Sequence, residues 1–270
     1  MELYLFQREE FNRFYNCSKI NIEDLPLQSR IHPGKGMIVI FLCAIFYILY
    51  IPCSFSLFKR RENACYKLML YICAIDFSAL WLLGFLQGWL SNIGAVYCSY
   101  PDVIYLAGVS VTCLWMTESA AQIFLAINRC MAILSPNAED FFFKGSRTYF
   151  WLALLTIYGM YIATFTKPVL YTGLFFSWSF NPYVGYLVDT ESTYVNYLHT
   201  VHDTAVAIIL PSIYAVFFVL FVIKTKAGGG SKAISSKQRM LFIQILIIGF
   251  IHLVGCLLYA SLPYVNFAAV

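Results

Sequence analysis

Two acidic residues lie within long apolar stretches of the sequence. Glu118 is the one charged residue in the run 104–127, and Asp76 interrupts the apolar stretch that begins near Cys65. Asp76 follows Cys65 by eleven residues, and Glu118 precedes Arg129 by eleven residues. Because a helix rises about 1.5 Å per residue, each carboxylate would lie about 16 Å from the end of its helix. We therefore expect both acids at the same depth, near the middle of a bilayer.

These two acids have two physical interpretations. An ionised carboxylate is costly in hydrocarbon, so intramembrane acids face the bundle interior and either find a partner or become protonated. Asp76 and Glu118 could approach each other and share a proton or a small cation such as sodium. Alternatively, each acid is neutral and forms its own hydrogen bond with a nearby Ser or Thr. The residues themselves leave both interpretations open.

A second candidate is the run Asn128-Arg129-Cys130, which follows the apolar stretch around Glu118. Arg129 lies where a membrane-spanning helix would leave the hydrocarbon. An arginine at that position can extend its side chain to the lipid headgroups and have no further role. It can also act as a cationic switch at the inner end of the helix.

A third candidate is the group His199, His202 and Asp203, where another apolar stretch begins. Imidazoles and carboxylates are metal ligands, but a metal site needs further anchors that the sequence does not supply. The favoured interpretation is a solvated junction between a loop and a helix, and we predict no metal site and no cofactor. His252, in a later apolar stretch, would be an interior or pocket-lining residue.

The composition is that of a membrane protein with several spans. Hydrophobic residues make up 60% of the 270 residues and charged residues only 12%, whereas about 25% of a soluble domain is charged. The basic residues lie in loops instead of forming a patch, which argues against nucleic-acid binding. Residues 1–32 contain no signal-peptide hydrophobic core, so we expect the N-terminal segment to be retained.

Six apolar stretches are long enough to cross a hydrocarbon layer of about 30 Å as helices. Each span must be helical, because hydrocarbon offers no water to unpaired backbone groups. The predicted organisation is an extracellular N-terminal tail, residues 1–33, followed by a transmembrane helix-bundle domain, residues 34–270. The predicted spans are about 36–58, 65–90, 103–128, 148–165, 201–223 and 240–262.

Lysines and arginines near the span ends predict the orientation. They are concentrated in the loops after the first, third and fifth spans, namely 59–64, 135–147 and the flexible loop 224–239. The opposite side holds Lys167, Lys19, Arg30 and Lys35. The N-terminus is therefore expected outside the cell, and six spans would place the C-terminal residue outside as well.

Cysteine placement predicts one disulfide. Most of the nine cysteines fall within spans or on the reducing side of the membrane, where disulfides do not persist. Cys17 and Cys98 are expected outside, so we predict a bond between the tail and the loop before the third span. The sequence Asn16-Cys17-Ser18 also predicts N-glycosylation at Asn16, although such tripeptides occur by chance as well.

Motifs of common enzymes and channels are absent from the sequence. We find no zinc-protease helix motif, phosphate-binding loop or serine nucleophile elbow. No potassium-channel filter sequence or repeated-arginine span is present, and no internal repeat indicates a transporter. We therefore predict that the protein is not an enzyme.

Short runs in sequence order carry a resemblance to a known family. The longest are residues 94–101 (GAVYCSYP), 125–130 (LAINRC) and 143–149 (FKGSRTY), and the others are 15–18, 50–53, 65–69, Asp76, 182–183, 194–196 and 199–202. Together they resemble the nematode serpentine receptor class T chemoreceptors over nearly the whole chain. The resemblance implies an all-α membrane protein with a bundle of seven helices like that of G-protein-coupled receptors (GPCRs). It also makes Asn128-Arg129-Cys130 similar to the Asp-Arg-Tyr position of rhodopsin-like receptors, where Arg129 would contact the G protein or lock the inactive bundle.

Three features depart from this family or from rhodopsin-like receptors. The family has a seventh helix, whereas six spans are predicted here. The loop 167–200 has no cysteine for the loop-to-third-span disulfide that is common in rhodopsin-like receptors. The predicted sixth span, 240–262, contains no proline, so the kink that a proline usually supplies there is not expected.

The favoured function is a chemosensory receptor, a multi-pass protein of the plasma membrane. It would bind a small molecule from outside and signal through a heterotrimeric G protein, with membrane lipid and a receptor homo- or hetero-oligomer as further partners. By depth, the pocket lining would be Val111, Thr112, Trp115, His202 and Asp203. Apolar, aromatic-rich walls favour a volatile or lipid-like ligand over a charged one.

Two other functions stay open at the level of the sequence. The chain could be a truncated, non-signalling isoform or an incomplete gene product that at most pairs with full-length relatives. It could also be a small-solute transporter or channel. Ligand-evoked activation of a G protein would separate the receptor from both alternatives.

Overall fold

The computed structural model describes residues 1–18, 20–185, 189, 192–227, 247, 249–251 and 253–258. The described part is built mainly from helices, with one two-stranded sheet. The elements are α1 (Glu2–Phe6), α2 (Arg8–Phe14), η1 (Ile22–Asp24), α3 (Leu27–Arg30), α4 (Pro33–Lys59), α5 (Ala64–Leu80), η2 (Trp81–Leu86), α6 (Gln87–Asn92), η3 (Tyr97–Ser99), α7 (Pro101–Leu134), α8 (Pro136–Phe143), α9 (Arg147–Phe165), β1 (Leu170–Thr172), β2 (Ser177–Ser179) and α10 (Tyr197–Ala227).

Five helical segments in the described part are long and apolar enough to cross a membrane. They are Leu27–Lys59, Ala64–Asn92, Pro101–Leu134, Arg147–Phe165 and Tyr197–Ile223. A shorter apolar helix, Gly249–Leu258, lies within the predicted sixth span. The rest of that span, His252 included, and most of the predicted loop 224–239 lie outside the described residues.

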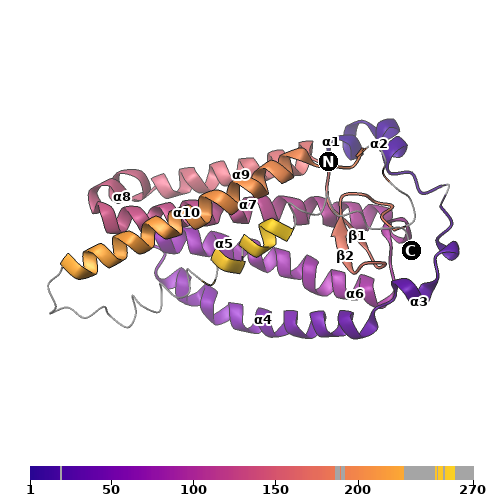
Figure 1. The fold of residues 1–270 in the computed structure, drawn as a ribbon, viewed down its shortest axis with the longest axis horizontal. Helices are drawn as coiled ribbons and strands as arrows, with labels where there is room; N and C mark the ends of the chain where they lie inside the picture. Colours follow the sequence, from indigo (N-terminus) through magenta and orange to yellow (C-terminus); the bar gives the residue numbers. More distant parts are fainter. Residues whose placement is uncertain are drawn as a thin grey trace.

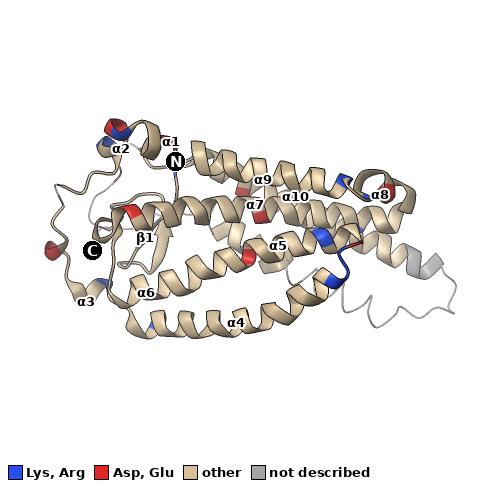
Figure 2. Ribbon diagram, turned by 180° about the vertical axis from the view of Figure 1, so that it is seen from behind, with Lys and Arg blue, Asp and Glu red and all other residues tan. Residues whose placement is uncertain are grey.

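The long helices run side by side along the length of the molecule (Figure 1), and α7 packs against α5, α9 and α10. The short helices α1 to α3 and the β-hairpin lie at one end, which also holds the Cys17–Cys98 disulfide, and we call it the disulfide end. At the opposite end, α8 lies beside a group of lysines and arginines (Figure 2). We call it the basic end, and its described basic residues include Lys59, Arg60, Arg61, Lys67, Lys144 and Arg147.

Glycines allow the spans to approach closely. A Cβ atom at Gly84 would lie 2.2 Å from the Cys43 sulfur of α4. A Cβ atom at Gly159 of α9 would lie 2.2 Å from the Thr117 hydroxyl of α7. Small residues at such crossings are typical of helix packing in membranes, where close contact replaces the hydrophobic driving force. We expect substitution by alanine at either position to push the helices apart.

Residues 1–33, predicted as a polar tail, form short helices that pack on the disulfide end. Phe11 and Tyr15 are buried in an aromatic core with Tyr105 of α7, and the Phe11 and Tyr105 rings meet edge to face at 4.9 Å. The hydroxyls of Tyr183 and Tyr194 donate to the carbonyl of Phe14 at 3.3 and 2.7 Å. The Cys17–Cys98 disulfide links this segment covalently to η3, and the segment covers the end of the bundle.

The long loop 167–200 contains the antiparallel hairpin β1–β2, in which Tyr171 pairs with Trp178. The hairpin is fixed to the bundle through its own backbone. The amide of Val169 donates to the Thr112 hydroxyl of α7 at 3.1 Å, and the amide of Gly173 donates to the Ala95 carbonyl at 2.8 Å. Tyr171 is fully buried as a result.

Helical structure extends beyond the predicted spans in several places. The helix that contains the predicted third span, α7, continues past residue 128 to Leu134 before Pro136 begins a new helix. The predicted loop 135–147 contains that helix, α8, whose N-terminus is capped by the Ser135 hydroxyl accepting from the Ala138 amide. The helix α10 continues to Ala227, while its segment that is long and apolar enough to cross a membrane is Tyr197–Ile223. Within the predicted second span, residues Trp81–Leu86 form a π-helical turn.

Candidate ligand site and basic-end contacts

A buried polar contact joins α7 to the first turns of α10. The indole nitrogen of Trp115 donates to one carboxylate oxygen of Asp203 at 3.0 Å. The other carboxylate oxygen lies 3.2 Å from Nδ1 of His199, one turn earlier on α10. Asp203 is fully buried and His199 is 2% exposed, so both are shielded from solvent. An unpaired acid would be costly there, and the hydrogen bond from Trp115 offsets part of that cost.

A second contact, centred on His202 of α10, joins three helices. Nε2 of His202 is 2.7 Å from the Ser119 hydroxyl of α7, and Nδ1 is 2.8 Å from the Tyr158 hydroxyl of α9. Ser119 donates to the backbone carbonyl of Trp115 at 2.8 Å, which leaves its oxygen to accept from His202. A neutral imidazole protonated at Nε2 then satisfies every group, with Tyr158 donating to Nδ1.

The prediction of a solvated junction at the start of α10 was wrong, because His199 and Asp203 are shielded from solvent. His199 and Asp203 are both buried, and Phe180, directly after β2, covers His199 with its ring, which meets the His199 ring edge to face at 5.1 Å. Among the residues that the structure describes, no group of three or more His, Cys, Asp or Glu is arranged to hold a metal ion.

Among the five residues predicted as pocket lining, three come together in the described part of the structure, and whether the five line one ligand pocket stays a prediction. Trp115, His202 and Asp203 meet around the two contacts above, and His202 also lines a cavity of about 320 Å³ between α7, α9 and α10. Thr112 is buried and anchors the hairpin through its hydroxyl. Val111 is buried in the aromatic core of the disulfide end.

Asp76 and Glu118 line the same cavity, of about 370 Å³, between α4, α5 and α7. The Tyr50 hydroxyl donates to Asp76 at 2.9 Å, and the side-chain amide of Gln122 donates to Glu118 at 2.9 Å. Each acid therefore has a donor, and in these two bonds the donor is Tyr or Gln instead of the Ser or Thr that the sequence suggested. Whether the acids share a proton or a cation stays a prediction.

At the basic end, Asn128, Arg129 and Cys130 make three different contacts. Asn128 is 1% exposed and donates to Glu139 of α8 at 3.1 Å, which ties α8 to α7. Arg129 is half-buried and its guanidinium lies 3.7 Å from the Met69 sulfur of α5. Cys130 is buried beside α10. Within the described ranges, Arg129 forms no ion pair with an acid.

The remaining predicted site residues lie at the disulfide end. Cys17 and Cys98 form a disulfide with a Cα–Cα distance of 5.5 Å. Asn16 is exposed, and its side-chain oxygen accepts from the Ser18 amide at 2.8 Å. The adjacent Tyr15 is buried, and this burial raises the pKa of its hydroxyl well above the usual value.

Comparison with known proteins identifies the family. The family model described as "Serpentine type 7TM GPCR chemoreceptor Srt" matches residues 1–270. The chain belongs to the Srt family. It is 22% identical over 197 residues to serpentine receptor class T-55 of Caenorhabditis elegans, an alignment that covers 73% of this chain and 53% of that relative. The chain thus spans about half the length of the relative that it matches.

Membership of the Srt family confirms the predicted fold class, a GPCR-like helical membrane bundle, and the predicted resemblance. The family is one of receptors and not of enzymes. In this Srt protein, sequence reasoning missed Ser119, Tyr158 and Phe180. Ser119 lies one helical turn after Trp115, so helix periodicity could have placed it on the same face. Tyr158 and Phe180 carry no such signal, because only tertiary packing brings them to His202 and His199.

Proposed function

We propose that this chain is a chemosensory receptor that binds a small molecule from outside the cell and activates a heterotrimeric G protein. The observation that carries the proposal is the single helix α7, which joins the Trp115–Asp203 contact near its middle to Arg129 towards its C-terminal end. A ligand that competes for the indole or the carboxylate would shift the packing of α10 on α7. Such differential binding to two states is what a receptor requires.

The proposed orientation places the disulfide end outside and the basic end in the cytoplasm, at the plasma membrane. Lysines and arginines favour the cytoplasmic side of a membrane protein. Disulfides persist in oxidising surroundings, which supports the same orientation through Cys17 and Cys98. Asn16 would then carry an N-linked glycan, and Asn16→Gln should abolish the mobility shift caused by a glycosidase.

At the basic end, we propose that Arg129 and its neighbours form part of the G-protein contact. Arg129 is half-buried among α5 and α7 and is held by a weak sulfur contact, so its guanidinium can be released at low cost. Asn128 fixes α8 beside it. Cys130, next to Arg129 in the sequence, lies against Ile213 of α10. A movement of α10 on α7 would therefore change the surroundings of Cys130.

The test is nucleotide exchange on a purified G protein, measured with membranes that contain the full chain and a panel of apolar volatile compounds. We expect at least one compound to raise the exchange rate. Arg129→Gln should remove the response, while the matched control Arg13→Gln, an exposed arginine of α2, should keep it. A response that survives Arg129→Gln unchanged would refute the proposed coupling role.

A further inference from the structure

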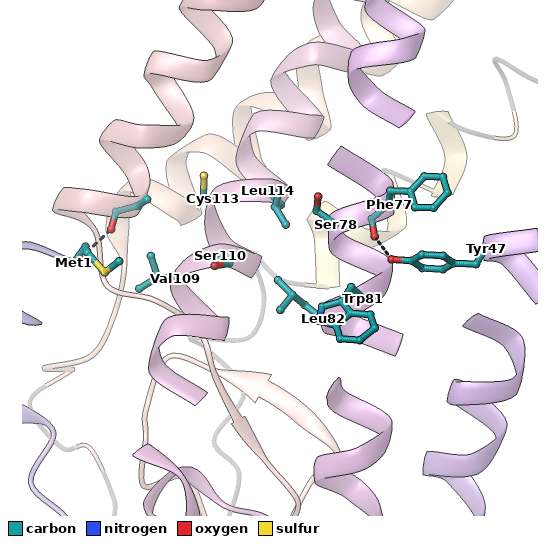
Figure 3. A pocket seen from close by; sticks show the side chains of 11 residues that line it. Met1, Tyr47, Phe77, Ser78, Trp81, Leu82, Val109, Ser110, Cys113 and Leu114 are labelled. Carbon is teal, nitrogen blue, oxygen red and sulfur yellow. Dashed lines mark hydrogen bonds between the residues drawn. The ribbon is translucent and has the colours of Figure 1, made fainter. Parts of the chain in front are cut away.

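A cavity of about 690 Å³ lies on the flank of the bundle, apart from the contacts described above. Figure 3 shows its walls, with Tyr47 and Phe77 on one side and Met1 and Val109 on the other. Its residues come mainly from α4, α5, η2 and α7. The volume falls within the range of roughly 300–1,000 Å³ that is typical of small-molecule sites. None of the residues that the sequence analysis assigned to a ligand lines it.

The charged group among the lining residues of this cavity, the Met1 ammonium, donates to the backbone carbonyls of Ala163 and Thr164, both at 3.0 Å. No Asp, Glu, Lys, Arg or His side chain is among its lining residues. Each lining hydroxyl or thiol donates to a backbone carbonyl inside the protein. The bonds are Tyr47 to Phe77 (2.6 Å), Ser78 to Ala74 (3.1 Å), Ser110 to Leu106 (2.9 Å) and Cys113 to Gly159 (3.1 Å). A guest that needed strong hydrogen bonds would therefore lose its bonds to water without replacement.

The rim of the cavity faces the side of the bundle and not one of its ends. Trp81, at the start of the π-helical turn, lines the cavity and is 58% exposed. Ser110, on α7, is also exposed. Both lie within helices of membrane-spanning length, so we expect the exposed rim to face lipid hydrocarbon. π-helical turns occur frequently at functional sites, and this one forms part of the wall.

We propose that this cavity binds one acyl chain of a membrane lipid, which enters sideways between η2 and α7. Three observations select this occupant. The lining carries no charged side chain and its one ammonium, that of Met1, donates to backbone carbonyls. Its hydroxyls and thiol are already bonded within the protein, and its rim lies within the spans. The proposal rests on the membrane bundle alone and is independent of ligand-evoked signalling.

The test uses the 270-residue chain in lipid nanodiscs that contain a phosphatidylcholine with a photoreactive diazirine in its acyl chain. Ser110→Trp fills the cavity with an indole. Ser212→Trp is the matched control, because Ser212 is also an exposed serine of a span, bonds the carbonyl one turn earlier and does not line this cavity. Formation of the Cys17–Cys98 disulfide, measured on unreduced peptides, reports whether each variant is folded.

After illumination, mass spectrometry should locate the lipid adducts preferentially on the lining residues of wild type and Ser212→Trp. Ser110→Trp should reduce these adducts about tenfold, which corresponds to about 1.4 kcal/mol of lost binding. Adducts spread evenly over all spans in wild type would overturn the proposal, and this result does not depend on the folding of any variant. Labelling of the cavity by a free diazirine alkane but not by the lipid would overturn it as well.

Discussion

The Trp115–Asp203 contact should stabilise the bundle through a measurable coupling between α7 and α10. The bond length is 3.0 Å and Asp203 is fully buried, so no water replaces either partner when one is removed. Trp115→Phe keeps an aromatic ring and removes the donor. Asp203→Asn keeps the shape of the acceptor and removes its acidity.

The expected magnitude follows from two sets of measurements. Hydrogen bonds in proteins contribute about 0.5–1.5 kcal/mol each, and those with charged groups about 1.5–3 kcal/mol. Between membrane helices, double-mutant cycles average about 0.6 kcal/mol with a maximum near 1.7. Because this acceptor is a carboxylate shielded from solvent, we expect a coupling of about 1–1.5 kcal/mol, near the upper end of the membrane values.

The assay is unfolding of the purified chain in mixed detergent micelles, with wild type, Trp115→Phe, Asp203→Asn and the double variant. Trp89→Phe combined with Asp203→Asn is the control cycle, because Trp89 lies on α6 and is 44% exposed. The control should be additive within about 0.3–0.5 kcal/mol. If the Trp115–Asp203 cycle were additive within the same limit, the contact would not join the two helices as inferred.

Three further predictions concern other parts of the chain. Cys98→Ser should lower the free energy of unfolding by about 2–4 kcal/mol, because the disulfide closes a long loop, whereas Cys53→Ser, an exposed free cysteine, should change it little. Burial raises the pKa of Tyr171 to about 12, so its contribution to stability is complete below about pH 10 and is lost as pH rises towards 12. In Tyr171→Phe, the fraction of folded protein should fall less steeply across that pH interval than in the wild type. If Asp76 and Glu118 bind sodium, sodium chloride should raise the melting temperature more than the chloride of a larger organic cation does. Asp76→Asn and Glu118→Gln should each remove that difference, and a melting temperature indifferent to sodium in the wild type would refute cation binding.

The sequence predicted those parts of the molecule that depend on composition and helix geometry. Apolar stretches predict the described spans, and counting residues along two helices places Asp76 and Glu118 at one depth, where they line one cavity. The sequence did not predict burial that depends on tertiary contacts. The polar character of residues 1–33 concealed Phe11 and Tyr15, whose burial requires Tyr105 of a distant helix.

The start of α10 shows the same limit. From the sequence, His199, His202 and Asp203 at a predicted helix start were expected to be exposed to solvent, because the sequence does not show which residues cover them. Phe180, directly after β2, packs on His199, and Trp115 of α7 supplies a donor to the acid. Cavities are equally hidden, since the cavity beside Ser110 is formed by four elements that no sequence pattern links.

The receptor proposal requires that the disulfide end face the outside and the basic end face the cytoplasm. The direct measurement is labelling by a membrane-impermeant maleimide of cells that express Phe6→Cys or Glu62→Cys, with the wild-type signal subtracted. Both positions are exposed, one on α1 and one between α4 and α5. We predict labelling of Phe6→Cys on intact cells and of Glu62→Cys only after permeabilisation. The reverse pattern would contradict the proposed sensing and coupling faces together.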